Sequence, residues 1–319
     1  MKFGLLLAAP NQAAGTDLAD AAVRNARRAR ELGFDIIVAG QHILTGPEPY
    51  LQPLPLLSRL VPETGSMRLA TGVLLLPLHE PVHIAEQTAS LDVLSGGRLI
   101  LGVGQGYRPV EFESLGVPRQ ERGARHREAL EVIERLWSGE PVTYNGRHFA
   151  LDGVRASITP VQRPRPPIWC AATTRARFDK VLQAGYMPYT GPTTPASAAL
   201  SWASASSQGI VLRRDIFVTK KEPRTTAYEH ATQRLRRYAR WGYGDDAAPD
   251  PDVLTDRYLL GSVSDCVEQL STYARGGVDT VVLRCQWPAL PTAESEDMLE
   301  RVGEVLNDFR GKTVSSRDG

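Results

Sequence analysis

The sequence predicts an α/β protein that folds as a TIM (β/α)8 barrel with insertions, and three observations support this fold class. Short apolar runs alternate with helix-length amphipathic segments along the 319 residues. The runs are aliphatic on both faces, as parallel strands covered by helices must be. Eight such runs occur, which is the strand number of a barrel that needs ~250 residues plus insertions. We therefore expect one domain over residues 1–319. The alternative is an open doubly wound sheet, which the lack of a glycine-rich first turn disfavours.

The first half of the chain predicts four regular strand-and-helix units. Each unit begins with a run rich in Leu, Ile and Val and continues into a segment with helical periodicity. Repeated units of this kind imply a parallel sheet with the helices outside. The expected strands and helices are, in order, 2–8 and 17–32, 34–40 and 53–64, 68–76 and 81–94, and 98–105 and 125–139.

A β-hairpin near 141–152 interrupts this alternation. Asn145-Gly146 lies between two strand-like arms in "VTYNGRHFAL", and this dipeptide favours a tight turn between paired strands. The proline-rich stretch 160–167 predicts an extended segment, because proline disfavours helix in the residue before it. A loop is expected at 241–252. The remaining strands are expected at 167–172, 186–191, 209–219 and 278–285, with one helix ending near 184 and others at 223–241, 263–276 and 293–309.

The charge balance argues against two classes of partner. Lys and Arg together number 37 and Asp and Glu 36, which leaves a net charge of +1. This balance indicates neither nucleic acid nor an anionic membrane as a partner, and no apolar stretch reaches the ~18 residues of a membrane span. A basic cluster does occur in one expected helix, and we interpret it as a solvated face. Its members are Arg234, Arg236, Arg237 and Arg240.

The cysteines suggest a reducing compartment. Cys170, Cys266 and Cys285 are too few and too widely spaced for a disulfide framework or a zinc site. The short apolar run near the N-terminus carries one basic residue and makes a poor signal peptide. We therefore expect a cytoplasmic protein.

A polar pair ends the second expected strand. The run "FDIIVAG" is built for a core, yet Gln41 and His42 follow it directly. In a TIM barrel the carboxyl ends of the strands carry the functional groups. We therefore expect Gln41 and His42 to face a ligand, although a structural role for a lone histidine stays open. Other polar strand ends are Asn11 and Gln12, "PLHEP" (77–81), "GQGYR" (104–108), "AATTRAR" (171–177) and "CQWP" (285–288).

The composition of these strand ends favours a bound cofactor. Carboxylates are scarce there, which disfavours glycosidase chemistry with its two acidic groups. No pair among the six histidines has the spacing of a metal-binding helix, and no G-x-S-x-G elbow occurs. Strand ends rich in histidine, glutamine and glycine indicate that a cofactor performs the difficult chemistry.

Two strand-end segments have features of ligand-binding turns. "GVGQGYRP" has only loosely the glycine spacing of a phosphate loop. Its glycines either give backbone room at the barrel mouth or let a flat ring lie against the backbone. In "AATTRAR", Thr173 and Thr174 begin a helix directly after a strand. Hydroxyls and free amides at such a helix start favour an anion, and Arg175 and Arg177 add positive charge. Simple N-capping is the alternative for the threonines.

The segment from about 68 to 151 closely resembles the bacterial luciferase-like flavin-dependent monooxygenase superfamily. The resemblance is almost continuous over "ATGVLLLPLHEPVHIAEQTASLDVLSGGRLILGVGQGYRPVEFESLGVP" and "ERGARHREALEVIERLWSGEPVTYNGRHFAL". "PVQRPRPPIW" and "GSVSDCVEQLSTYARGGVDTVVLR" resemble later landmarks of the family. The resemblance covers most of the chain and is weak from about 190 to 260, where the family varies and forms part of the substrate pocket.

The resemblance implies a TIM barrel that binds reduced flavin at its strand ends. Some members use FMN and oxygen, and others use a deazaflavin coenzyme for hydride transfer without oxygen. We expect an FMN-dependent monooxygenase that oxidises a small to medium apolar molecule. The reduced FMN should come from a separate flavin reductase, because no nicotinamide site is visible in the sequence. A homodimer is expected. The alternatives are a deazaflavin-dependent oxidoreductase and a non-catalytic flavin-binding subunit.

The resemblance also assigns roles to single residues. His42 matches the family's catalytic strand-2 histidine, and Gln41 stands where luciferase has a glutamate, so we expect it to hydrogen-bond flavin or substrate. Gly72-Val73 matches a non-prolyl cis peptide beside the flavin ring. The remaining expected cofactor-binding residues are Gly104 and Gln105 after strand 4, and Thr173, Thr174, Arg175 and Arg177 in the phosphate-binding turn. The expected pocket walls are Leu44, Pro47, Tyr50, Leu51, Tyr107 and Trp287.

Several positions depart from the luciferase pattern. Gln105 replaces a phosphate-binding arginine, Gly104 replaces a cysteine, and "CAA" replaces the usual strand-5 glycines. We expect Arg175 or Arg177 to compensate for the missing arginine. Light emission is not expected.

Overall fold

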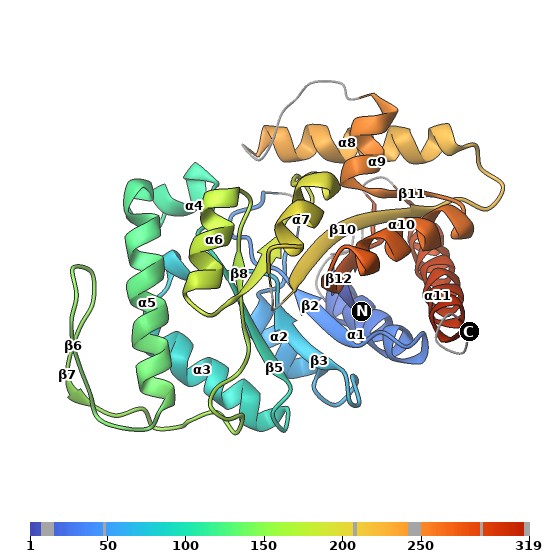
Figure 1. The fold of residues 1–319 in the computed structure, drawn as a ribbon. Coiled ribbons are helices and arrows are strands. Elements are labelled where there is room, and N and C mark those ends of the chain that lie inside the picture. Colours follow the sequence, from blue (N-terminus) through green and yellow to red (C-terminus); the bar gives the residue numbers. More distant parts are fainter. Residues whose placement is uncertain (8–15, 47–48, 207–208, 242–249, 288–289, 316–319) are drawn as a thin grey trace. The chain divides into compact units, whose positions relative to one another are not determined.

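A computed structural model describes residues 1–7, 16–46, 49–206, 209–241, 250–287 and 290–315 (Figure 1). The strand-end residues Asn11 and Gln12, the expected pocket residue Pro47 and Pro288 of "CQWP" lie outside these ranges. By its internal contacts the chain divides into two compact units. One unit comprises residues 38–171, and the other comprises residues 1–37 and 172–319.

The unit of residues 38–171 is built on parallel strands. They run in the order β3 (Arg68–Thr71), β5 (Leu99–Gly104) and β8 (Ile168–Ala171), and the short β4 (Leu74–Leu75) also pairs with β5. All six residues of β5 are buried, as expected for a strand that is covered on both faces. The helices of this unit are α2 (Pro53–Leu60), α3 (Pro81–Leu94), α4 (Pro109–Glu113) and α5 (Arg122–Trp137).

The unit of residues 1–37 and 172–319 is also built on parallel strands. They run in the order β11 (Leu259–Gly261), β10 (Ile210–Val218), β12 (Val278–Arg284) and β1 (Lys2–Leu7), and β9 (Met187–Thr190) pairs with β10. The strand β2 (Ile36–Ala39) crosses the boundary between the units. The helices are α1 (Thr16–Glu31), α6 (Arg175–Gln183), α7 (Ala196–Ala203), α8 (Arg224–Arg240), α9 (Pro251–Arg257), α10 (Val263–Arg275) and α11 (Thr292–Ser315).

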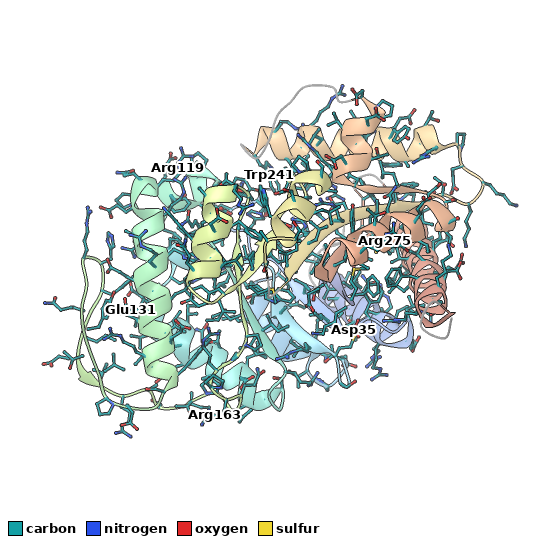
Figure 2. All side chains as sticks on the ribbon, in the orientation of Figure 1. Asp35, Arg119, Glu131, Arg163, Trp241 and Arg275 are labelled. Atoms are coloured by element: carbon teal, nitrogen blue, oxygen red, sulfur yellow. The ribbon has the colours of Figure 1, made fainter. Side chains whose placement is uncertain are left out.

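The order of strands and helices confirms the predicted TIM (β/α)8 fold class. The eight expected strands form and pair in parallel, and the expected helices follow them. The predicted hairpin also forms: β6 (Val142–Asn145) and β7 (Ala150–Val154) pair antiparallel beside α5 (Figure 1). Exposed charged side chains cover the outer helices, for example Glu131 on α5 and Arg275 on α10 (Figure 2). None of the helices among the described residues combines the length and the apolar character needed to cross a bilayer.

The structure differs from the prediction in short elements. The expected strand 68–76 is broken into β3 and β4, with a cis peptide between Gly72 and Val73. Residues 251–252 were predicted as loop but begin α9, because Asp250 caps the backbone N–H of Val253 and Pro251 occupies the first turn. The short elements α4, α7 and β11 were not predicted, since eight residues or fewer carry little periodicity.

Candidate active site

The end of β2 is tied to the turn between β3 and β4. The Gly72 N–H donates to the Ala39 carbonyl at 2.8 Å, and the Gln41 N–H donates to the Val73 carbonyl at 3.2 Å. The cis peptide that the resemblance implied for Gly72-Val73 is present. Two predicted parts of the site, the polar pair after β2 and the cis turn, therefore lie side by side.

The Gln41 side chain is buried and connects three neighbours. Its Oε1 accepts from the Leu75 N–H at 2.8 Å and lies 3.0 Å from His79 Nε2. Its Nε2 donates to Gln52 Oε1 at 2.9 Å, and Gln52 Nε2 donates to the His42 carbonyl at 3.0 Å. Because an amide oxygen can only accept, His79 must carry its proton on Nε2. Both ends of the Gln41 amide are thus used within the chain, and its contact with a ligand stays a prediction.

His79 supplies a neutral imidazole to this network. Burial lowers its pKa from the usual 6.5, because a charged imidazole loses solvation there. At neutral pH His79 is therefore a neutral donor to Gln41. From the sequence, His79 was expected only as part of the polar strand end "PLHEP", without a role of its own.

The imidazole of His42 is held by a buried carboxylate. His42 Nδ1 lies 2.9 Å from Glu111 Oε1, and the side chain of His42 is 16% exposed whereas that of Glu111 is fully buried. The same Oε1 accepts from the Ile43 N–H at 3.2 Å. A carboxylate only accepts, so Nδ1 carries the proton and Nε2 keeps the lone pair of the neutral ring. Glu111 Oε2 is buried and has no hydrogen-bond partner among the described residues.

Arg108 completes this arrangement. Its Nη1 lies 3.2 Å from Glu111 Oε1 and donates to the Ile43 carbonyl at 2.9 Å. Its Nη2 donates to the Leu44 carbonyl at 3.3 Å. Leu44 has a φ of 53°, a left-handed conformation that is strained for a leucine. Arg108 therefore holds both the carboxylate and the backbone that follows His42. The Leu44 side chain is 56% exposed, and its role as a pocket wall stays a prediction.

Two tyrosines flank His42. The ring centroids of Tyr50 and Tyr107 lie 5.6 Å and 5.7 Å from that of His42, both edge-on. A Cβ atom at Gly40 would approach the Tyr50 hydroxyl to 2.8 Å, so the glycine makes room for this ring. The structure thus brings two predicted pocket residues to the predicted catalytic histidine.

The glycines after strand 4 accommodate the neighbouring segment. A Cβ at Gly104 would lie 2.6 Å from Val73 Cγ2, and a Cβ at Gly102 would lie 1.9 Å from the Thr71 carbonyl oxygen. This geometry favours the interpretation that the glycines give backbone room. Contact of Gly104, and of the half-buried Gln105, with a flavin stays a prediction.

The other predicted cofactor residues belong to the unit of residues 1–37 and 172–319. Thr173 and Thr174 are exposed at the start of α6, and the Thr174 hydroxyl caps the helix by accepting from the Arg177 N–H at 3.3 Å. Arg175 pairs with Asp179 at 2.8 Å. Trp287 is 2% exposed and donates to the Ile216 carbonyl at 2.7 Å. It is therefore buried among the described residues of its own unit, and its role as a pocket wall stays a prediction.

Three residues of this arrangement had no predicted role: Glu111, Gln52 and Arg108, the last residue of the strand-end segment 104–108. The expectation that carboxylates are scarce at the strand ends overlooked Glu111, which lies seven positions beyond the end of β5. Arg108 and Glu111 are three positions apart and bracket Pro109, the first residue of α4. This i, i+3 spacing next to a helix-starting proline was the available signal.

The chain belongs to the luciferase-like monooxygenase family, whose sequence model matches residues 1–209. It is 30% identical over 159 residues to the oxygenase component of a flavin-dependent trigonelline monooxygenase from Acinetobacter baylyi, covering 48% of this chain and 43% of that protein. The chain spans about half the length, or less, of such curated relatives.

Two solved structures share the fold. Monooxygenase RslO1 from Streptomyces bottropensis has a TM-score of 0.84 at 24% identity, covering 97% of this chain and 99% of that chain. An F420-dependent secondary alcohol dehydrogenase in complex with an F420–acetone adduct has a TM-score of 0.78 at 16% identity, covering 97% and 98%. At these identities the similarity establishes the fold alone, so cofactor and substrate must be argued from the site.

Proposed function

We propose that this protein is a flavin-dependent monooxygenase that uses reduced FMN and oxygen to oxidise a small to medium organic substrate. The observation that carries the proposal is the His42–Glu111 pair, 2.9 Å apart, on the strand end that is bonded to the Gly72-Val73 turn. Membership of the luciferase-like monooxygenase family supports the reaction class.

The described residues around this turn fit a flat, conjugated ring. Gln41 and the neutral His79 are uncharged hydrogen-bonding groups, and Tyr50 and Tyr107 are aromatic walls beside His42. The exposed hydroxyls of Thr173 and Thr174 at the start of α6 would hold the phosphate. When bound, reduced flavin supplies the electrons with which oxygen is activated and transferred.

His42 is the group of this chain that moves a proton. With Nδ1–H directed to Glu111, its Nε2 can take a proton from one reacting group and return it to another. Glu111 fixes the tautomer and stabilises the imidazolium that forms, while Arg108 holds the carboxylate in place. Acid–base help of this kind contributes about 10²–10⁴-fold to the rate.

A deazaflavin-dependent oxidoreductase is the second candidate. A solved structure with the same fold is an F420-dependent dehydrogenase, so the fold is compatible with a deazaflavin, and the same histidine would then serve hydride transfer without oxygen. The relative described as an oxygenase component favours the first candidate and a separate flavin reductase as partner. We further propose a cytoplasmic homodimer. A flavin-binding subunit without turnover is the third candidate, which the His42–Glu111 pair disfavours.

Anaerobic titration with reduced FMN and with reduced deazaflavin distinguishes the first two candidates, and oxygen uptake with reduced flavin and a panel of apolar substrates tests turnover. The His42→Ala variant should fold and bind flavin but lose turnover by about 10²–10⁴-fold. His83→Ala, on an exposed position of α3, is the matched control and should keep wild-type turnover. Wild-type turnover in His42→Ala would show that the histidine is a wall residue.

A further inference from the structure

The unit of residues 1–37 and 172–319 contains a buried cluster of arginines. Arg213, Arg214 and Asp215 are consecutive in β10, and the pairing of β10 with β12 places Asp215 opposite Arg284. Arg234 reaches the cluster from α8. The side chains of Arg214 and Asp215 are fully buried, and Arg234 is 1% exposed. From the sequence alone we interpret Arg234 as part of a solvated helix face. That interpretation is wrong for Arg234, because its turn of α8 faces the sheet.

Asp215 is the carboxylate that these guanidinium groups share. Its Oδ1 lies 3.3 Å from Arg213 Nη2, and its Oδ2 lies 3.5 Å from Arg234 Nε and accepts from the Tyr238 hydroxyl at 3.2 Å. Arg284 Nη1 donates to the same tyrosine oxygen at 3.4 Å. One negative charge therefore faces several positive charges.

The other contacts of Arg234 are uncharged. It donates to the Gln286 carbonyl, and its guanidinium lies 5.1 Å from the centroid of the Trp287 ring. Arg214 does not belong to this cluster, because successive side chains of a strand point to opposite faces and its own contacts are the carbonyls of Gly191, Arg213 and Thr194. A buried cation needs a negative partner. Among the described residues Asp215 is the one carboxylate within ion-pair distance of Arg234, and Asp215 also faces Arg213, so the described part of the cluster holds less negative than positive charge.

The acid–base properties agree with this imbalance. Burial and the nearby Arg284 lower the pKa of Arg234 to about 10. Burial and Arg284 lower the pKa of Arg237, three positions further along α8, to about 10 as well. By contrast, the pKa of Asp215 is lowered although the group is buried, because the surrounding arginines favour its charged form.

A buried hydroxyl provides a second observation. Tyr258 is fully buried, and its hydroxyl has no hydrogen-bond partner among the described residues. Its ring lies 6.0 Å from that of Trp287, on which Arg234 stacks. Burial, Asp215 and Tyr238 raise the pKa of Tyr258. The group therefore keeps its proton and is a donor in need of an acceptor.

We propose that this cluster is a binding site for an oxyanion, namely the carboxylate, sulfonate or phosphate group of an organic ligand. Arg234 and Arg284 supply the charge, and Tyr258 supplies a neutral donor. Planar guanidinium groups match oxyanions in geometry and in charge. Arg213 and Arg284 are partly exposed, so in this proposal they are the members of the cluster that a ligand from solvent meets first. The proposal does not depend on the reaction proposed above.

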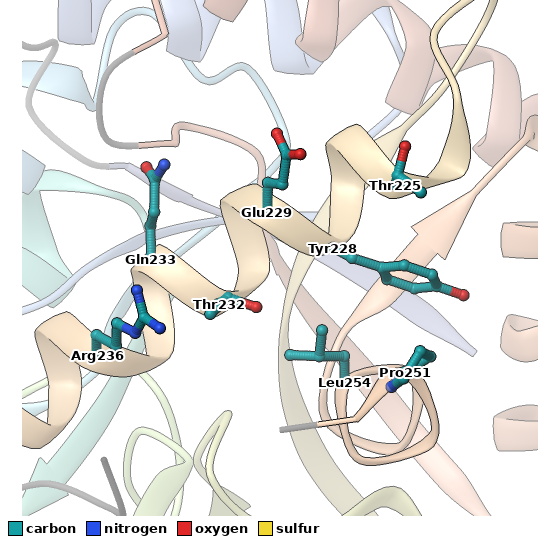
Figure 3. A pocket seen from close by; sticks show the side chains of 8 residues that line it. All are labelled: Thr225, Tyr228, Glu229, Thr232, Gln233, Arg236, Pro251 and Leu254. Carbon is teal, nitrogen blue, oxygen red and sulfur yellow. The ribbon is translucent and has the colours of Figure 1, made fainter. Parts of the chain in front are cut away.

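The opposite face of α8 offers a matched control. It lines an open cavity of about 380 Å³ between α8 and α9 (Figure 3). Arg236 is exposed there, and Glu229 lines the same cavity. Arg236→Gln removes one positive charge from the same helix without touching the cluster.

The test is thermal unfolding of the full chain at constant ionic strength with benzoate, methanesulfonate or inorganic phosphate, with neutral benzamide as the reference. A ligand that binds the folded state raises the Tm in a saturable manner. We expect such a rise with at least one oxyanion and none with benzamide. Arg284→Gln should weaken oxyanion binding about 10-fold or more, and Arg236→Gln less than about 2-fold.

Tyr258→Phe separates ligand binding from folding. Without an anion this variant should unfold at or above the wild-type Tm, because the hydroxyl that it removes has no partner. The affinity of Tyr258→Phe for the oxyanion should be lower than that of the wild type. The absence of a saturable rise for every oxyanion in the wild type, or equal losses in Arg284→Gln and Arg236→Gln, would overturn the proposal.

A second arm identifies the source of the oxyanion by comparing FMN with riboflavin. If Arg284→Gln weakens the binding of FMN but not that of riboflavin, the site binds the flavin phosphate. If neither changes while benzoate or methanesulfonate binding falls, the site takes the acidic group of another organic ligand. Both results support an oxyanion site.

Discussion

Replacing Glu111 by glutamine tests the central arrangement of the candidate active site. The change keeps the shape of the side chain and removes its charge. Glu111 Oε1 lies within 3.2 Å of three donors: His42 Nδ1, the Ile43 N–H and Arg108 Nη1. The Glu111 side chain is fully buried and that of Arg108 is 10% exposed. Glu111→Gln therefore removes a negative charge from beside a largely buried guanidinium.

The expected loss of stability follows from these contacts. Removing one partner of a buried ion pair costs ~3–5 kcal/mol. The glutamine oxygen can still accept from the same three donors, and each neutral hydrogen bond returns about 1 kcal/mol. We expect a net loss of about 1–2 kcal/mol, measured as a lower urea midpoint at an unchanged m value. Turnover should also fall while flavin affinity is kept, because the His42 imidazolium that forms during proton transfer loses the negative charge that stabilises it.

A double-mutant cycle with Arg108→Gln isolates the pair. Because both variants break the same interaction, the double variant should be less destabilised than the sum of the single variants by about 1 kcal/mol or more. Glu113→Gln, an exposed position of α4, is the matched control and should change stability by less than about 0.5 kcal/mol. A loss below about 0.5 kcal/mol in Glu111→Gln, or an additive cycle, would refute the reasoning.

Three further predictions concern other parts of the site. Joint replacement of Thr173 and Thr174 by alanine should weaken the binding of FMN more than that of riboflavin, by ~1.5–3 kcal/mol for each charge-assisted hydrogen bond lost. Equal losses of affinity for the two flavins would show that the phosphate binds elsewhere. Gly104→Ala should destabilise by ~1–3 kcal/mol, because the added methyl would stand 2.6 Å from Val73 Cγ2. Adding Val73→Ala should recover part of that loss, and strictly additive effects would contradict this contact. Burial lowers the pKa of His79 in the folded protein. Below pH ~6.5 the histidine is therefore protonated more readily in the unfolded chain than in the folded one. The free energy of unfolding should thus be full above that pH and decline as the pH falls. His79→Gln should flatten this decline in urea midpoints, and an unchanged pH dependence would argue against it.

Local sequence patterns were sufficient for the main elements. The helix predicted at 81–94 is observed as Pro81–Leu94, because Pro81 sets the first turn and Gly96-Gly97 follow the last one. Strand runs were found because residues buried on both faces form continuous apolar stretches, as in β5. The position of His42 directly after β2 followed from the same reasoning, since barrel strands end at the functional mouth.

The sequence by itself therefore determined the fold class, the principal elements and the strand end on which His42 lies. Only the tertiary structure decided which distant groups meet there. Glu111 is 69 positions from His42 and bonds to it because the segments after β2 and β5 converge. From the sequence, Arg234 is likewise predicted to be one member of a basic, solvated helix face. Only the packing of α8 shows that it is buried against Asp215. Periodicity reports the burial of neighbouring residues along one element, whereas a charge pair depends on contacts between elements that are far apart in the chain.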